Sequence, residues 1–204
     1  MDAKLLAWGL RRKPSCLPRL WLFTDDRRLP DPRASVANLP RGRAGVVLRH
    51  DHDPDRAMLG RDLAQICRAR RLVLVVAGDG RLAAALKAGV HLRGGYRTGA
   101  LRPAGTVTSS AHSVPDLKRA QRAGADLIFL SPAFPTASHA GEPGLGPLRW
   151  AASARRVGTQ QGIAALGGVD GHTVKRLPSQ FCRAIGAIGA LAIPDPARRG
   201  ATFK

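Results

Sequence analysis

The chain has 204 residues, 44% of them hydrophobic, which favours a single domain and excludes a chain too polar to bury a core. Only 4% are aromatic, so we expect a core of Val, Leu, Ile and Ala, the mixture typical of buried parallel strands covered by helices. The formal charge is +19, but its basic residues are spread along the chain without a recognition motif, so we expect a solvated arginine-rich surface and keep nucleic-acid binding as the least favoured hypothesis.

The chain begins with a short apolar stretch that basic residues follow. This start, MDAKLLAWGLRRKPSC, lacks the long apolar region and the cleavage site of a secretory signal. No apolar run approaches the roughly 20 residues of a membrane span, so we expect no membrane partner. Residues 1–18 are predicted to form a loosely attached N-terminal arm. The three cysteines are odd in number and widely spaced, which predicts a reducing cytoplasmic location.

Eight short apolar runs, each bounded by turn residues, predict strands that are buried on both faces. They lie at 20–23, 45–49, 72–77, 89–92, 106–111, 126–131, 162–166 and 184–191. Between them, helical spacing and capping residues predict helices at 53–71, 114–124 and 147–158. The remaining segments can each supply only a turn or two of helix, at 33–39, 80–88, 171–177 and 194–199.

Eight strands joined by crossovers predict a right-handed parallel arrangement. The strand count, and the lack of a GxGxxG motif after the first strand, favour a closed (β/α)8 TIM barrel over an open sheet. An irregular stretch between the fourth and fifth strands indicates a small barrel with one or two outer helices reduced. We expect the barrel to span residues 19–193, with the arm before it and a frayed tail at 194–204.

Glycines gather where the last two predicted strands end, in ALGGVDG (165–171) and AIGAIGAL (184–191). Glycine lets the backbone approach a ligand closely, and its N–H groups can then surround a phosphate. The usual phosphate position of a (β/α)8 barrel follows the seventh and eighth strands. We therefore predict phosphate binding at Gly167, Gly168 and Gly189. Tight turns without any ligand are the alternative interpretation.

The segment TSSAHSVPDLKRAQRAGADLIFLSPAFPTASHAGEPGLG (108–146), followed by ALGGV (165–169), resembles thiamine phosphate synthase and its relative TenI. The earlier strand ends GVHL, VVLRHD and LFTDD are similar to those of the same family, in the same order. The resemblance covers about residues 19–191. It implies a thiamine-biosynthesis enzyme whose partner is a phosphorylated thiazole. The synthase joins this thiazole to hydroxymethylpyrimidine pyrophosphate, with Mg2+ and basic groups to take up the charge on the leaving pyrophosphate.

Several positions match the substrate-binding residues of that family. They are Arg49 after the second strand, Asp79 at the first metal carboxylate, Ser110 in the fifth strand, Thr136 and Ser138 on the thiazole side of the sixth loop, and Gly168 at the thiazole phosphate. Other positions depart from the pattern. Asp51 stands where the synthase has a lysine, the second metal carboxylate falls near Gly95 or Tyr96, and His139 stands at the lysine of the sixth loop, where it is a candidate phosphate donor.

One remaining aspartate makes a poor magnesium site, so we predict no metal ligands, and Mg2+ only if synthase activity is retained. The TenI branch resembles this chain in carrying a histidine just after the fifth strand, here His112. In that branch the histidine shuttles a proton while a thiazole carboxylate phosphate tautomer becomes aromatic, which suits imidazole and needs no metal. A capping or packing role is the alternative for this residue.

The favoured hypothesis is therefore a TenI-like enzyme, a thiazole tautomerase in which His112 is catalytic. A true thiamine phosphate synthase and a non-catalytic thiamine-metabolite binder stay open, as does assembly into a homo-oligomer. His91 lies inside a predicted strand, where we expect an internal hydrogen-bonded residue. HDHD (50–53) could direct only two side chains inward together, so a metal site there is disfavoured.

Overall fold

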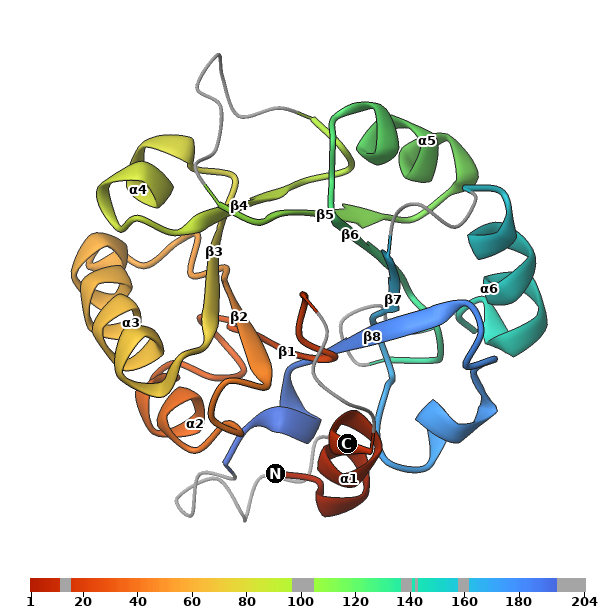
Figure 1. Ribbon diagram of the computed structural model, residues 1–204, viewed down its shortest axis with the longest axis horizontal. Coiled ribbons are helices and arrows are strands. Elements are labelled where there is room, and N and C mark those ends of the chain that lie inside the picture. The colour runs from red at the N-terminus through yellow and green to blue at the C-terminus, as the bar shows by residue number, and fades with distance from the viewer. Residues whose placement is uncertain (12–15, 97–104, 137–140, 142, 158–161, 194–204) are drawn as a thin grey trace.

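The computed structural model describes residues 1–11, 16–96, 105–136, 141, 143–157 and 162–193 (Figure 1). Within these ranges eight parallel strands close into a barrel in chain order, and the last strand pairs with the first. The strands are β1 (Leu20–Phe23), β2 (Ala44–Leu48), β3 (Val73–Ala77), β4 (Gly89–Leu92), β5 (Val107–Ala111), β6 (Leu127–Leu130), β7 (Gly162–Ala165) and β8 (Cys182–Ala187). The predicted closed (β/α)8 barrel is confirmed.

Helices surround the barrel, as Figure 1 shows. They are α2 (Arg33–Ala37), α3 (Arg56–Arg70), α4 (Gly80–Ala85), α5 (Val114–Arg122) and α6 (Gly146–Arg155). In the described part of the chain, only the short 3-10 turns η1 (Thr173–Arg176) and η2 (Gly189–Leu191) follow the last two strands. The predicted final strand, 184–191, was therefore too long. A run of Gly, Ala and Ile has no period that would reveal where a strand ends and a turn begins.

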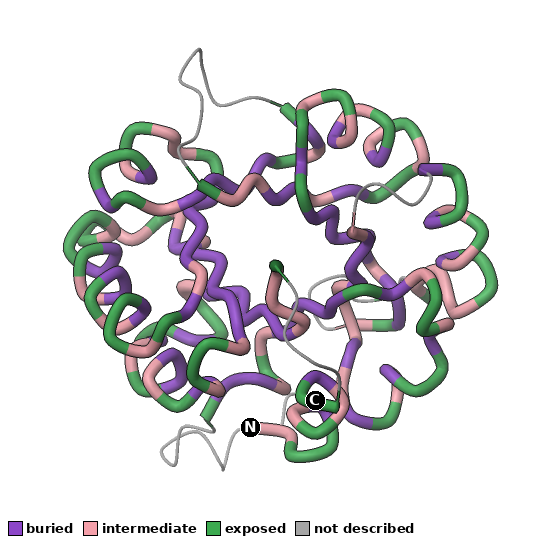
Figure 2. The backbone as a smooth tube through the Cα atoms, in the orientation of Figure 1, coloured by how far each residue is buried: buried purple, intermediate pink, exposed green. Residues whose placement is uncertain are grey.

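Successive strand residues alternate between the barrel interior and the helices, as the pleat requires. Leu20 and Leu22 contribute to the outer core, whereas Trp21 and Phe23 belong to the interior core. The interior rings are in edge contact, with centroids 4.8 Å apart for Phe23 and Phe129. The other buried members of this interior core are aliphatic, as expected, so the expectation missed only the aromatic rings: Val47, Val75, Ala77, Leu127, Ala164 and Ala184. Figure 2 shows the buried strands and the exposed outer faces of the helices.

Helix α1 (Ala3–Leu10) lies outside the barrel, and its start is beside the segment that follows β8 (Figure 1). Its Leu5 is completely buried. Asp2 caps the helix by accepting a hydrogen bond from Leu5 N, and it also accepts one from Gly171 N at 2.7 Å. The backbone N–H of Asp2 donates to Ala190 O at 2.7 Å. The expected loose attachment was thus wrong, because the partners of this helix come from the far end of the sequence.

The division into an arm (1–18), a barrel (19–193) and a tail (194–204) stays a prediction, and the tail lies outside the described residues. Among the residues that are described, no helix is long and apolar enough to cross a membrane.

Candidate functional site

A cleft of about 390 Å³ opens at the end of the barrel where β6, β7 and β8 end. Its lining comes from five strand-following loops: Arg28, Arg49, Ser131, Pro132, Phe134, Pro135, Thr136, residues 166–170, Thr173, Arg176 and residues 186–190. Five of the predicted site residues line this one cleft, namely Arg49, Thr136, Gly167, Gly168 and Gly189. The strand ends therefore bring together groups that are 140 positions apart in the sequence (189 − 49 = 140).

The turn after β7 is built for a close approach of the backbone. Gly167 and Gly168 have φ of 87° and 63°, and a Cβ on Gly168 would overlap Pro135 O. Thr173 Oγ1 fixes the turn by donating to Gly168 O at 2.9 Å. Within the described part of the chain, the N–H groups of Gly167 and Gly168 make no hydrogen bond. These two donors are available to an anion in the cleft.

Asp170 completes this turn as a hydrogen-bond acceptor. Its carboxylate accepts from the backbone N–H groups of His172 and Thr173, both at 2.8 Å. The bond from Thr173 N is the largest of the effects that hold the pKa of Asp170 below its usual value, although burial opposes the shift. The carboxylate is thus committed to the loop, which stiffens the cradle around Gly168.

Three guanidinium groups give the cleft an excess of positive charge. Arg28, Arg49 and Arg176 line it, together with the single carboxylate of Asp170. Arg176 also lies over the Phe134 ring, 5.3 Å from its centroid. A cleft lined by one sign of charge concentrates ligands of the opposite sign. Sequence reasoning missed Arg28 and Arg176, because neither stands out in a chain that has 33 Lys and Arg.

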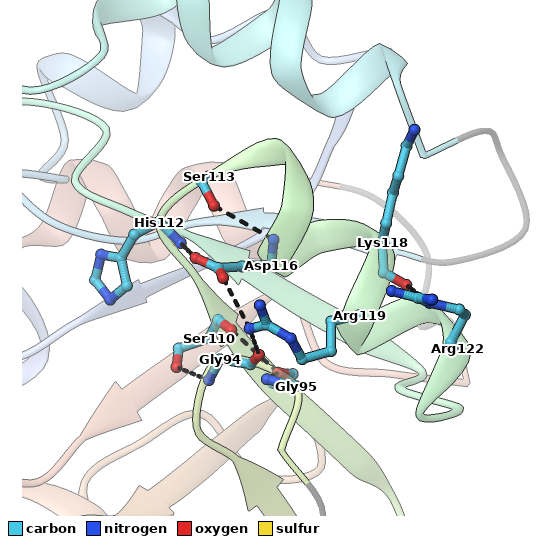
Figure 3. Close-up of polar contacts among 10 residues, drawn as sticks. Gly94, Gly95, Ser110, His112, Ser113, Asp116, Lys118, Arg119 and Arg122 are labelled. Carbon is cyan, nitrogen blue, oxygen red and sulfur yellow. Dashed lines mark hydrogen bonds and ion pairs between the residues drawn. The ribbon is translucent and has the colours of Figure 1, made fainter.

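His112 follows β5 directly, at the start of the loop that leads into α5 (Figure 3). Its backbone N–H donates to Asp116 Oδ2 at 3.1 Å, and Ser113 caps α5 by accepting from Asp116 N. The imidazole points away from Asp116 and Arg119 in this view. Its Nδ1 lies 3.4 Å from the Oγ of Ser131, a residue of the cleft lining. One hydroxyl therefore separates the histidine ring from the cleft.

Burial alone would raise the pKa of Asp116, but the hydrogen bonds from His112 N, Ser113 and Arg119, with the charge of Arg119, lower it below its usual value. Asp116 is thus held as a carboxylate that fixes the backbone at His112. Arg119 Nη1 donates to Asp116 Oδ1 at 2.9 Å and to Gly94 O at 2.7 Å, and so bridges the two residues (Figure 3). The start of α5 and the turn after β4 are consequently joined behind the histidine.

Two predicted substrate-binding residues are not among those that line the cleft. Ser110 accepts a hydrogen bond from Gly94 N at 3.2 Å and so holds the turn after β4 (Figure 3). Asp79 caps α4 by accepting from Leu82 N at 2.9 Å. Two others, Ser138 and His139, lie outside the described residues.

The donor set near Asp79 does not fit a magnesium ion. Asp79 Oδ2 lies 3.7 Å from Arg56 Nη1, and Asp51 Oδ1 contacts both Arg56 and Arg93. Nowhere in the described ranges do three or more His, Cys, Asp or Glu side chains form a group that could hold a metal. Each of these two carboxylates faces at least one guanidinium, which repels a divalent cation.

Two histidines near the mouth have structural partners. His91 is buried in the barrel, with Nδ1 2.9 Å from Thr108 Oγ1, which confirms the expected internal residue. Burial, followed by the charges of Arg49 and Arg93, lowers its pKa to about 3, so the ring is neutral near pH 7. His50, the first residue of HDHD, is buried between Thr24 Oγ1 at 2.9 Å and Pro30 O at 3.1 Å.

Comparison with known proteins adds independent evidence. The family model TMP-TENI, described as thiamine monophosphate synthase, matches residues 24–191, a span that includes every predicted site residue. The chain is 32% identical over 152 residues to the thiamine-phosphate synthase of Geobacillus kaustophilus, covering 70% of this chain and 67% of that protein. It is 28% identical over 186 residues to a putative thiamine-phosphate synthase 2 of Aquifex aeolicus, covering 87% and 96%.

A bifunctional thiamine biosynthesis protein, ThiED of Geobacter sulfurreducens, is 31% identical over 195 residues. The match covers 90% of this chain but only 39% of that relative. Among solved structures, a thiamine phosphate pyrophosphorylase from Pyrococcus furiosus superimposes with a TM-score of 0.71 at 21% identity, covering 84% of this chain and 86% of that one. At that identity the likeness shows the common barrel fold.

Proposed function

This chain belongs to the thiamine monophosphate synthase family, TMP-TENI, and from that premise we propose that it binds a thiazole phosphate and catalyses a TenI-like proton transfer. The observation that carries the proposal is the position of His112, whose ring is one hydroxyl away from a cleft lined by glycine turns and arginines. The phosphate binds to the N–H groups near Gly168, and Thr136 orients the ring.

Proton transfer balances without any co-reactant. Neutral His112 accepts a proton from one carbon of the thiazole tautomer, and the imidazolium returns a proton to another position, so the ring becomes aromatic at constant composition. Ser131 Oγ, 3.4 Å from His112 Nδ1, orients the imidazole toward the cleft. Arg49 stabilises the negative charge that develops on the substrate after the first transfer.

The test compares His112→Ala with His52→Ala, which removes an exposed histidine that does not line the cleft. Turnover of the thiazole carboxylate phosphate tautomer is followed by NMR. We expect His112→Ala to lose on the order of 10²-fold or more in kcat, because a positioned general acid–base group contributes that much, while His52→Ala keeps the activity of the parent protein. Full activity of His112→Ala would contradict the role of the histidine.

Thiamine phosphate synthesis is the second candidate, and the names of the relatives favour it. Incubation with the pyrimidine pyrophosphate, thiazole phosphate and Mg2+ separates the two activities, and we expect no thiamine phosphate. Rapid formation of that product would reverse the ranking. Tight calorimetric binding of thiamine phosphate without turnover of either substrate set would favour a non-catalytic binder. A cytoplasmic location and self-association into a homo-oligomer belong to the same proposal.

A further inference from the structure

Four charged side chains form a cluster where β2, β3 and β4 end, beside the cleft. Asp51 follows β2, Asp79 follows β3, Arg93 follows β4, and Arg56 is the first residue of α3. Arg56 lies 3.5 Å from Asp51 and 3.7 Å from Asp79, and Arg93 contacts the same Asp51 oxygen. The two arginines balance the two aspartates, so this ion-pair cluster has no net charge.

Arg56 is the central member of the cluster. Its side chain is only 17% exposed, against 56% for Arg93. Besides facing both carboxylates, it donates a hydrogen bond to Ala77 O at 2.6 Å, which anchors it to the end of β3. Attraction between charges is stronger where water is partly excluded, so the two carboxylates stabilise the poorly exposed guanidinium at ion-pair distance.

We propose that Arg56 is a built-in cation that takes the place of a divalent ion between Asp51 and Asp79. A metal would need the oxygens that face Arg56, while the other oxygen of Asp79 is committed to the N-terminus of α4. Two guanidinium groups would also repel it. The cluster does not hold a diphosphate either. Its arginines are already neutralised by the aspartates, and its carboxylates repel anions.

The consequence for the substrate rests on the proposed function. If the cleft takes a thiazole phosphate, the ion-pair cluster restricts the enzyme to a substrate with one phosphate and no metal-bound diphosphate partner. The arginine-lined cleft attracts the single phosphate, whereas the ion-pair cluster beside it repels a metal-bound diphosphate. Such a repulsive element is a common way to exclude a competing ligand.

The test titrates the purified protein with MnCl2 alone and counts bound ion by electron paramagnetic resonance. We expect the parent protein to bind no Mn2+ saturably and Arg56→Ala to bind it saturably, because Asp79 Oδ2 loses its arginine partner and Asp51 keeps only the more exposed Arg93. The double variant Arg56→Ala/Asp79→Asn should lose the gain, since asparagine still caps α4 but carries no charge. Arg61→Ala, at an exposed position on the same helix, is the control for lost net charge.

Saturable Mn2+ binding by the parent protein that Asp79→Asn abolishes would overturn the proposal. A folded Arg56→Ala protein that gains no affinity for Mn2+ would also overturn it. If that variant does not fold, Arg56→Met, which keeps the aliphatic stem of the side chain, replaces it in the titration. The readout needs no catalysis. A failure of the proton-transfer proposal would therefore leave this measurement unchanged, and the two hypotheses can fail separately.

Discussion

Gly168 is the most crowded of the glycines that line the cleft. Its φ is 63°, and a Cβ would overlap Pro135 O and press on Phe134. We expect Gly168→Ala to lower the free energy of unfolding by about 1–3 kcal/mol and to weaken binding of inorganic phosphate at least about tenfold, because the strained turn moves away from its neighbours. Urea unfolding and calorimetry with phosphate measure the two effects.

Gly42 supplies the matched control for this substitution. Its φ is 66°, nearly the same, but a Cβ there has no atom within 4 Å and it lies in an exposed turn. Gly42→Ala should therefore show only the cost of the left-handed conformation, about 1–2 kcal/mol, and leave phosphate affinity unchanged. Equal phosphate affinity in both variants would show that the Gly168 turn does not hold the anion.

His91 links pH to stability. Its pKa is about 3 in the folded protein, against 6.5 for an ordinary histidine. Between these values the unfolded chain binds one more proton, so the free energy of unfolding falls as pH falls below about 6.5. We expect His91→Gln, which can still bond to Thr108, to lose less stability than the parent protein between pH 7 and about pH 4. Parallel pH profiles from urea unfolding would refute this assignment.

At the scale of elements, the strands could be predicted because continuous apolar runs leave few alternatives to a doubly buried strand. The predicted run 126–131 and the observed β6 (Leu127–Leu130) differ only at their ends. Helix α1 was missed, because its stability depends on Gly171 and Ala190, which no local pattern connects to residues 2–10. Tertiary contacts of this kind override weak local signals.

Helix α1 ties together the two loops that form the glycine side of the cleft. Asp2 accepts from Gly171 N and donates its own N–H to Ala190 O. We expect Asp2→Ala to destabilise the protein by about 1–2 kcal/mol through the lost cap, and to raise the KM for the thiazole phosphate substrate more than it lowers kcat. Kinetics and thermal unfolding test this together.

Lys4→Ala is the control on the same helix, because this exposed lysine lies 3.3 Å from His172 and, within the described residues, has no other side-chain contact of this kind. It should leave KM and stability nearly unchanged. If Asp2→Ala lowers stability but leaves KM unaltered, α1 supports the barrel and does not position the loops.

For the whole molecule, 33 Lys and Arg face 14 Asp and Glu, so pairing cannot neutralise the surface. We expect duplex oligonucleotides to bind weakly, with an affinity that falls steeply with salt and does not depend on sequence. Fluorescence anisotropy at several salt concentrations measures this. A sequence preference that persists at about 150 mM salt would contradict the interpretation of this charge as a solvated surface.

The candidate site was predictable where strand ends and glycines define it, as for Gly168 and Gly189. It was not predictable where long side chains decide the result. Asp79 stands at a metal position of the family by its place after the third strand, yet in the structure it caps α4 and faces Arg56. Which oxygen is free depends on side-chain partners, and a sequence does not record them.

The central claim is that the glycine turns and the imidazole of His112 serve one ligand. A crystal structure with thiazole phosphate tests it most directly. The account predicts the phosphate against the N–H groups of Gly167, Gly168 and Gly189, with the thiazole ring between Thr136 and the Ser131–His112 pair. A phosphate bound elsewhere, or a ring on the far side of the mouth from His112, would contradict it.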